Sequence, residues 1–120
     1  MVKRNIVHVE IPATDPKASG KFYGKLFGWQ IEHDDAMNYT MFDPHDGPPG
    51  GFTDQMKAGE VLIHVNSEDI DADLKKALAL GGSIVAEKSE IPGIGWWGVF
   101  KDPTGNSISL FTALMPDGSK

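Results

Sequence analysis

The chain carries IVHVEIPATDPKASGKFYGKLFGWQ at residues 6–30 and IHVNSEDIDADLKKALALGGSIV at residues 63–85. Each stretch begins with a short apolar run containing His-Val, continues through an acidic turn and closes a helical pattern with glycine. Asp15 and Asp69, which occupy equivalent places in the two stretches, are 54 residues apart, close to half of the 120-residue chain. The sequence therefore predicts a duplicated unit, and a cleft on the axis relating two such units is a natural place for a binding site.

From Val7 to Ile11 the first stretch alternates between apolar and polar residues, although the apolar Ile6 breaks the pattern at its start. Val7, Val9 and Ile11 are apolar, and His8 and Glu10 lie between them. Because successive side chains of a strand point to opposite faces, this pattern predicts a strand with one face on a core. The two polar side chains then lie on the other face.

A helix is predicted directly after this strand. Asp15-Pro16 supplies an N-cap residue and a proline at the first helical position, and Gly28 supplies a left-handed end. Apolar residues four positions apart predict one buried helix face. The residues of this predicted face are Ala18, Phe22, Leu26 and Phe27. Three more strands are expected, at residues 30–32, 39–42 and 51–53.

The second stretch repeats this order. Residues 61–65 predict a second strand, with Val61, Ile63 and Val65 on its core face and Leu62 and His64 on the opposite face. Asp69 caps a helix that ends at Gly81-Gly82. Its predicted buried stripe is Ile70, Leu74, Ala77 and Leu78. Strands are expected at residues 83–87, 97–100 and 107–111.

Each half thus reads as strand, helix, strand, strand, strand, which predicts an α+β fold. The chain is expected to be one domain, residues 1–120, with one unit at about 1–55, a second at about 56–112 and a short tail.

Composition excludes several classes of protein. There is no cysteine, hence no disulfide framework, thiolate zinc site or nucleophilic thiol. The net charge is −6, and the eleven Lys and Arg form no cluster, which argues against nucleic acid and membrane surfaces as partners. No segment resembles a signal peptide or a membrane span, so the expected location is the cytoplasm.

Four segments carry a resemblance to a known family: HVEIPATD, FYGKLFGWQI, EVLIHVNSEDIDADLKKALALGG and FKDPTGNSISLF. The chain resembles the vicinal oxygen chelate superfamily, which includes glyoxalase I, bleomycin-resistance proteins and extradiol dioxygenases. Its GIGWWGVFKDPTGN ending looks like that of a branch of small glyoxalase-related proteins. The resemblance implies curved mixed sheets around a cavity, helices outside and a homodimer. Whether the units pair within one chain or across a swapped dimer is left open.

The resemblance also implies four metal-ligand positions, one on the first and one on the last strand of each unit. These correspond to His8, Leu62, Gly51 and Ser109. Only His8 is a good donor, whereas a stable divalent site needs three or more His or carboxylate donors. No cofactor is expected, with His8 as a weak metal candidate. In the alternative, Glu10 and His64, two residues along, recruit a metal.

The remaining candidates have competing interpretations. His8 and Glu10 are the catalytic candidates, but His8 could also be a relic held by a hydrogen bond, and Glu10 a solvated rim residue. Of Trp96 and Trp97, one should fill the core and the other face the cavity, since they are adjacent on a strand. The predicted ligand-binding set is His8, Glu10, Leu62, His64, Trp96, Trp97 and Ser109.

Three other residues receive structural interpretations. His33 and His45 lie in polar, turn-like stretches and are expected to be exposed, and Trp29 is expected to plug the core.

Three functions stay open at this stage. The first is a metal-free module that binds a small organic molecule, as in bleomycin-resistance proteins. The second is a metal-dependent lyase, isomerase or dioxygenase of the glyoxalase type. The third is a subunit without pocket chemistry.

Overall fold

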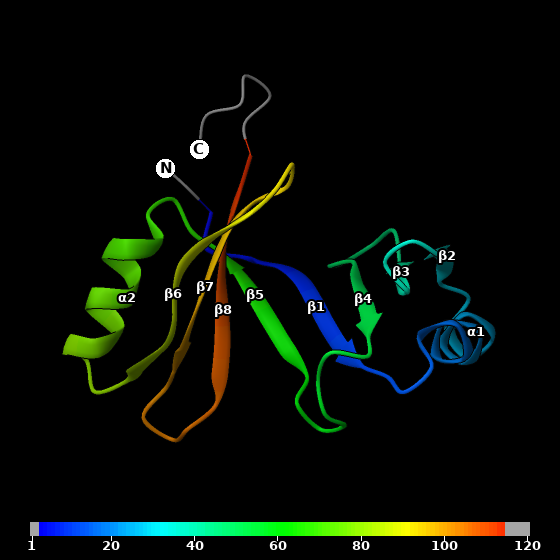
Figure 1. The fold of residues 1–120 in the computed structure, drawn as a ribbon, viewed down its shortest axis with the longest axis horizontal. Helices are drawn as coiled ribbons and strands as arrows, with labels where there is room; N and C mark the ends of the chain where they lie inside the picture. The colour runs from blue at the N-terminus through cyan, green and yellow to red at the C-terminus, as the bar shows by residue number, and fades with distance from the viewer. Residues whose placement is uncertain (1–2, 115–120) are drawn as a thin grey trace. The chain divides into compact units, whose positions relative to one another are not determined.

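The computed structural model describes residues 3–114, and the predicted tail residues from 115 onward lie outside this range. The chain divides into two compact units. The first unit is Ile6–Ile63, and the second is formed by the residues on either side of it. Each is described by itself below, and Figure 1 gives the element labels.

The first unit contains β1 (Ile6–Pro12), α1 (Pro16–Phe27), β2 (Gln30–Asp34), β3 (Tyr39–Asp43) and β4 (Gly50–Thr53). Its strands follow the order β2-β3-β4-β1. β1 runs parallel to β4, and the other pairs are antiparallel. This is the strand, helix, strand, strand, strand order that the sequence predicts.

The second unit repeats the arrangement with β5 (Leu62–Asn66), α2 (Ile70–Ala79), β6 (Ser83–Ile91), β7 (Gly95–Lys101) and β8 (Ser107–Ala113). Its strand order is β5-β8-β7-β6, and again the first strand is parallel to the last. The α+β class and the duplicated order are confirmed. β6 and β7 are longer than predicted because their hairpin pairing continues to the turn.

The predicted helix starts are confirmed. The Asp15 carboxylate accepts a hydrogen bond from the Ala18 amide at 3.3 Å, and Asp69 accepts one from the Ala72 amide at 3.1 Å. Gly28 ends α1 in the left-handed region, with φ of 76°. Within residues 3–114, no helix is long and apolar enough to cross a membrane.

The predicted buried face of α1 is wrong. Phe22, Leu26 and Phe27 are 61%, 59% and 56% exposed, whereas the buried residues of the helix are Pro16 and Gly20. Ala18 is exposed as well. The helix therefore turns its apolar stripe outward and packs on the sheet through a different face.

The reason lies in two glycines. A Cβ on Gly20 would lie 2.5 Å from Cγ2 of Thr40, and one on Gly24 would lie 2.8 Å from Cγ1 of Ile31. Gly20 and Gly24 are one helical turn apart, so they form a smooth strip on which the sheet lies close to the helix backbone. A smaller correction concerns α2, where Leu78 is 55% exposed while Ile70 and Leu74 are buried as predicted.

Each unit has its own hydrophobic core. The first is aromatic, with Trp29 stacked on Phe42 at 4.6 Å between ring centroids and on Tyr23 at 5.8 Å. Trp29 thus plugs the core as predicted. The second core is formed by Ile70, Leu74 and Leu110, with partly buried neighbours around them.

Candidate functional site

The outer faces of the strands follow from the pairing register. Val9 and Ile11 pack on the core of the first unit, so His8 and Glu10 lie on the opposite face of β1, as the alternation predicts. Glu10 is paired with Gly51 on β4, and Gly51 with Met41 on β3.

Tyr39, two residues before Met41 on β3, lies on the same face as these residues. The polar side chains of β1 and the phenol of β3 are brought together across β4. The sequence analysis did not identify Tyr39.

His8, Glu10 and Tyr39 lie within hydrogen-bond distance of one another and are called the polar triad below. The His8 Nε2 atom lies 2.7 Å from Glu10 Oε1 and 3.0 Å from the Tyr39 hydroxyl oxygen. The Tyr39 hydroxyl donates to Glu10 Oε1 at 2.9 Å. One carboxylate oxygen therefore accepts from the phenol and, in the tautomer with a proton on Nε2, from the imidazole.

The triad is largely withdrawn from solvent. The Glu10 side chain is 17% exposed and the His8 side chain 33% exposed. The interpretation of Glu10 as a solvated rim residue is therefore wrong, because its carboxylate is mostly covered and hydrogen-bonded. Burial raises the pKa of the Tyr39 phenol far above its ordinary value of 10.0, and the neighbouring Glu10 charge adds to the rise. The phenol thus remains a proton donor throughout the physiological range.

Gly51 explains how the phenol reaches this place. A Cβ at position 51 would collide with the hydroxyl oxygen and ring of Tyr39. The phenol therefore fills the space that a side chain at this family ligand position would need. Of the two implied ligand positions in the first unit, position 8 carries an imidazole. Position 51 carries no side chain, and the Tyr39 phenol fills the space beside it.

The second unit presents an equivalent face. His64 on β5 is paired with Ser109 on β8, and Val65 with Leu110 on the helix side. Leu62 lies on the His64 face by alternation. Ser109 is fully buried, and its hydroxyl donates a long hydrogen bond, 3.4 Å, to the Leu110 carbonyl oxygen. Neither Leu62 nor Ser109 brings an imidazole or carboxylate to the metal positions implied by the resemblance.

The two adjacent tryptophans separate as predicted. Trp96 packs against the core of the second unit, with the Lys88 ammonium 5.6 Å from its ring centroid. Trp97 is paired with Phe111, on the face that carries His64 and Ser109. Of the two tryptophans, Trp97 is therefore the one on the His64 face.

The two turn histidines differ. His45 is exposed as expected, with 66% of its side chain accessible. The expectation for His33 is wrong: its side chain is 15% exposed, and Nδ1 lies 2.6 Å from the Thr40 hydroxyl oxygen. His33 belongs to β2, whose pairing with β3 places it opposite Thr40 on the α1 side.

Comparison with known proteins identifies the family. A family model described as a glyoxalase-like domain matches residues 7–111. Over 113 residues the chain is 28% identical to CFP32 of Mycobacterium tuberculosis, provisionally named a glyoxylase. That alignment covers 89% of this chain and 42% of CFP32, so the chain spans less than half the length of this relative.

Solved structures agree on the fold. A glyoxalase/bleomycin resistance protein/dioxygenase superfamily member from Vibrio splendidus aligns with a TM-score of 0.65 at 15% identity, over 92% of this chain and 99% of that one. The Mn(II)-bound glyoxalase of Novosphingobium aromaticivorans aligns with a TM-score of 0.64 at 21% identity, over 99% and 41%. At these identities the likeness supports the fold alone.

Proposed function

Because the chain belongs to the glyoxalase-like family of the vicinal oxygen chelate superfamily, we propose that it binds a small, planar, carbonyl-bearing organic molecule through the polar triad. The observation that carries the proposal is the set of mutual contacts among His8, Glu10 and Tyr39, at 2.7, 2.9 and 3.0 Å. A few fixed polar groups in mostly apolar surroundings are what orients a ligand in a small-molecule site.

The chemistry of the triad suits a carbonyl group. The Tyr39 hydroxyl has one hydrogen, which goes to Glu10 Oε1 in the free protein, so a ligand carbonyl oxygen would accept that hydrogen in place of Glu10. Glu10 is also a carboxylate that could accept a proton from a carbon next to a carbonyl. The triad thus supports binding, and proton transfer is the reaction within its reach.

The binding test uses a neutral dicarbonyl, 1-phenyl-1,2-propanedione, and as its reference the corresponding diol, 1-phenyl-1,2-propanediol. We expect the protein to bind the dicarbonyl. Tyr39→Phe should weaken this binding about tenfold, which corresponds to the loss of one hydrogen bond worth about 1.4 kcal/mol. His45→Ala is the matched control, because His45 is exposed and outside the triad. Equal binding of dicarbonyl and diol, or no loss in Tyr39→Phe and His8→Ala, would refute the proposal.

The second candidate is a metal-dependent lyase, isomerase or dioxygenase of the glyoxalase type. It is favoured by one observation: His8 Nε2 and Glu10 Oε1, an imidazole and a carboxylate, lie 2.7 Å apart. Both are ligand types that divalent metals accept. When bound, such a metal would polarise a substrate carbonyl as a Lewis acid. Against it, the residues at the family ligand positions 51, 62 and 109 offer no imidazole or carboxylate.

Metal analysis separates the two candidates. The protein is purified without chelators and without a metal-affinity tag, and bound zinc, nickel, iron and manganese are measured. For the metal-free function we expect less than stoichiometric metal. Stoichiometric metal that is lost in both His8→Ala and Glu10→Ala would favour the enzyme. A His64→Ala variant tests the remaining imidazole that the sequence analysis proposed as a donor.

A further inference from the structure

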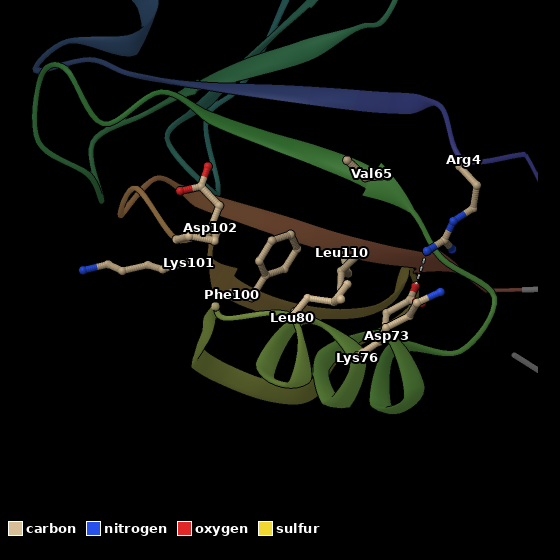
Figure 2. A pocket seen from close by; sticks show the side chains of 12 residues that line it. Arg4, Val65, Asp73, Lys76, Leu80, Phe100, Lys101, Asp102 and Leu110 are labelled. Atoms are coloured by element: carbon tan, nitrogen blue, oxygen red, sulfur yellow. Dashed lines mark hydrogen bonds and ion pairs between the residues drawn. The ribbon is translucent and has the colours of Figure 1, made fainter.

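The second unit holds a cavity that the polar triad does not use. It lies between α2 and the helix-side face of the sheet and has a volume of about 410 Å³. Its apolar lining includes Val65 of β5, Phe100 of β7 and Leu110 of β8, with Leu80 at the end of α2. We call it the α2 groove, and Figure 2 shows these side chains from close by.

The groove exists because α2 covers only part of its sheet. The helix makes most of its contacts with β6, β7 and β8, and Val65 of β5 lines the groove on the helix-side surface beside them. Val65 and Leu110 are paired on this surface, and Phe100 faces it from β7. The result is an apolar floor with one open side, of a size typical of small-molecule sites.

One end of the groove is positively charged. Arg4 and Lys76 line it there, together with Asp73 (Figure 2). The Asp73 Oδ2 atom accepts hydrogen bonds from Arg4 Nη2 at 2.7 Å and from the Ser67 hydroxyl at 2.6 Å. Within residues 3–114, no ion pair involves the Lys76 ammonium. This end therefore carries two cations and one carboxylate that is already bonded.

The opposite end of the groove does not cancel the positive charge at the Arg4 and Lys76 end. The Asp102 carboxylate is turned into its own loop, where it accepts from the amides of Thr104, Gly105 and Asn106 at 2.9–3.0 Å. These bonds hold the pKa of Asp102 below its usual range. Lys101, also at this end, extends its side chain away from Phe100 (Figure 2). An anionic ligand would meet its attraction at the Arg4 and Lys76 end.

We propose that the α2 groove binds a small organic monoanion with an aryl or acyl body. The anionic group lies at Arg4 and Lys76, and the body covers Phe100, Leu80 and Leu110. The charges favour a small anion over a second copy of this chain as the occupant of the groove. A single anionic group matches the cationic end of the groove, whereas a whole chain of net charge −6 has no general complementarity to an apolar surface. The proposal does not rest on the polar triad.

The experiment is a titration with 2-naphthoate, followed by amide chemical shifts, with 2-naphthalenemethanol as the neutral reference of the same shape. We expect naphthoate to bind with a dissociation constant below about 1 mM, to shift amides of α2, β5 and β8, and to bind at least about fivefold tighter than the alcohol. Lys76→Gln should remove most of that preference. Lys75→Gln is the control, because Lys75 is exposed and does not line the groove.

A second pair of variants tests the apolar floor. Leu80→Glu should weaken naphthoate binding at least tenfold, whereas Leu78→Glu should not. Both side chains are largely exposed, at 71% and 55%, so neither change should unfold the protein. Tyr39→Phe should leave naphthoate binding unchanged, which separates this site from the proposed function.

Four results of the binding experiments would overturn the proposal. They are no binding up to several millimolar naphthoate, equal binding of the alcohol, equal effects of Leu78→Glu and Leu80→Glu, and shifts centred on β1 and β3. A concentration-dependent increase in mass that Leu80→Glu abolishes would also overturn it, in favour of a contact between copies.

Discussion

At the residue scale, the pair of Gly51 and Tyr39 shapes the outer face of the first unit. The phenol occupies the volume next to a residue without a side chain, so the two positions constrain each other. The same phenol completes the hydrogen bonds of Glu10. A change at either residue should therefore alter the geometry of the whole polar triad.

The first prediction concerns this pair. Gly51→Ala should destabilise the protein by about 1–3 kcal/mol, because the added methyl group collides with the Tyr39 ring. In a Tyr39→Ala background the same substitution should cost little, since the space has been vacated. Chemical denaturation of the four proteins gives the coupling free energy. Equal costs of Gly51→Ala in both backgrounds would contradict the packing described above.

The second prediction concerns alkaline pH. The pKa of Tyr39 is raised in the folded protein, mainly by burial, above the ordinary 10.0 of the unfolded chain. As pH rises, Tyr39 therefore loses its proton in the unfolded chain before it does so in the folded protein. The contribution of Tyr39 protonation to the free energy of unfolding is complete below pH 10 and is lost as pH rises further. We expect the denaturation midpoint of the wild type to fall more between pH 9 and 11 than that of Tyr39→Phe. Parallel curves for the two proteins would show that Tyr39 ionises normally.

The site could be predicted from the sequence only where the determinant is local. The alternation around His8 and Glu10 is local, and it correctly places both side chains opposite the core. The contact of Tyr39 with them depends on the pairing of β1 with β4 and of β4 with β3, which no local pattern specifies. The same holds for His33, which reads as a turn residue but is paired opposite Thr40.

At the element scale, α1 shows how an amphipathic pattern can be misread. An apolar stripe at four-residue spacing normally marks the buried face. Here Gly20 and Gly24 allow the helix backbone to approach Thr40 and Ile31 closely, and the bulkier stripe stays outside. Two small residues one turn apart are the signal that could have identified the packed face.

The third prediction tests which face of α1 is packed. Tyr23 packs against the first core and stacks with Phe52, whereas the adjacent Phe22 is 61% exposed. Because Tyr23 is partly buried, Tyr23→Ala should cost at most about 3–5 kcal/mol of unfolding free energy, the range for aromatic side chains truncated in cores. Phe22→Ala should stay within about 0.5 kcal/mol. Thermal denaturation of the two variants measures the difference, and comparable losses would mean that the helix packs on its apolar stripe after all.

At the scale of the whole molecule, the two units illustrate what duplication makes predictable. Strand order, the aspartate N-caps of the helices and the parallel pairing of first and last strands occur in both units. The side chains on these strands have diverged: Tyr39 with Gly51 in the first unit, and Ser109 beside His64 in the second. The repeat therefore predicts the backbone of each unit well and its chemistry poorly.

The fourth prediction is self-association. The family resemblance implies a homodimer, and α1 exposes Phe22, Leu26 and Phe27 within six residues of each other. Exposed apolar patches of this kind commonly mark contacts between proteins. We expect sedimentation velocity at about 100 μM to give roughly twice the monomer mass of 13.0 kDa. Leu26→Glu should weaken the association at least tenfold, and Leu78→Glu on α2 is the control.

Salt dependence distinguishes this contact from an electrostatic one. Lys17, Lys21 and Lys25 lie along the same helix, four residues apart, so a contact between two copies of α1 brings like charges together. Added salt screens that repulsion, with a screening length of about 10 Å at 0.1 M and about 3 Å at 1 M. The dimer should therefore tighten as salt rises. A clean monomer at high micromolar concentration in 0.5 M salt, or a dimer that salt dissociates, would exclude pairing through α1.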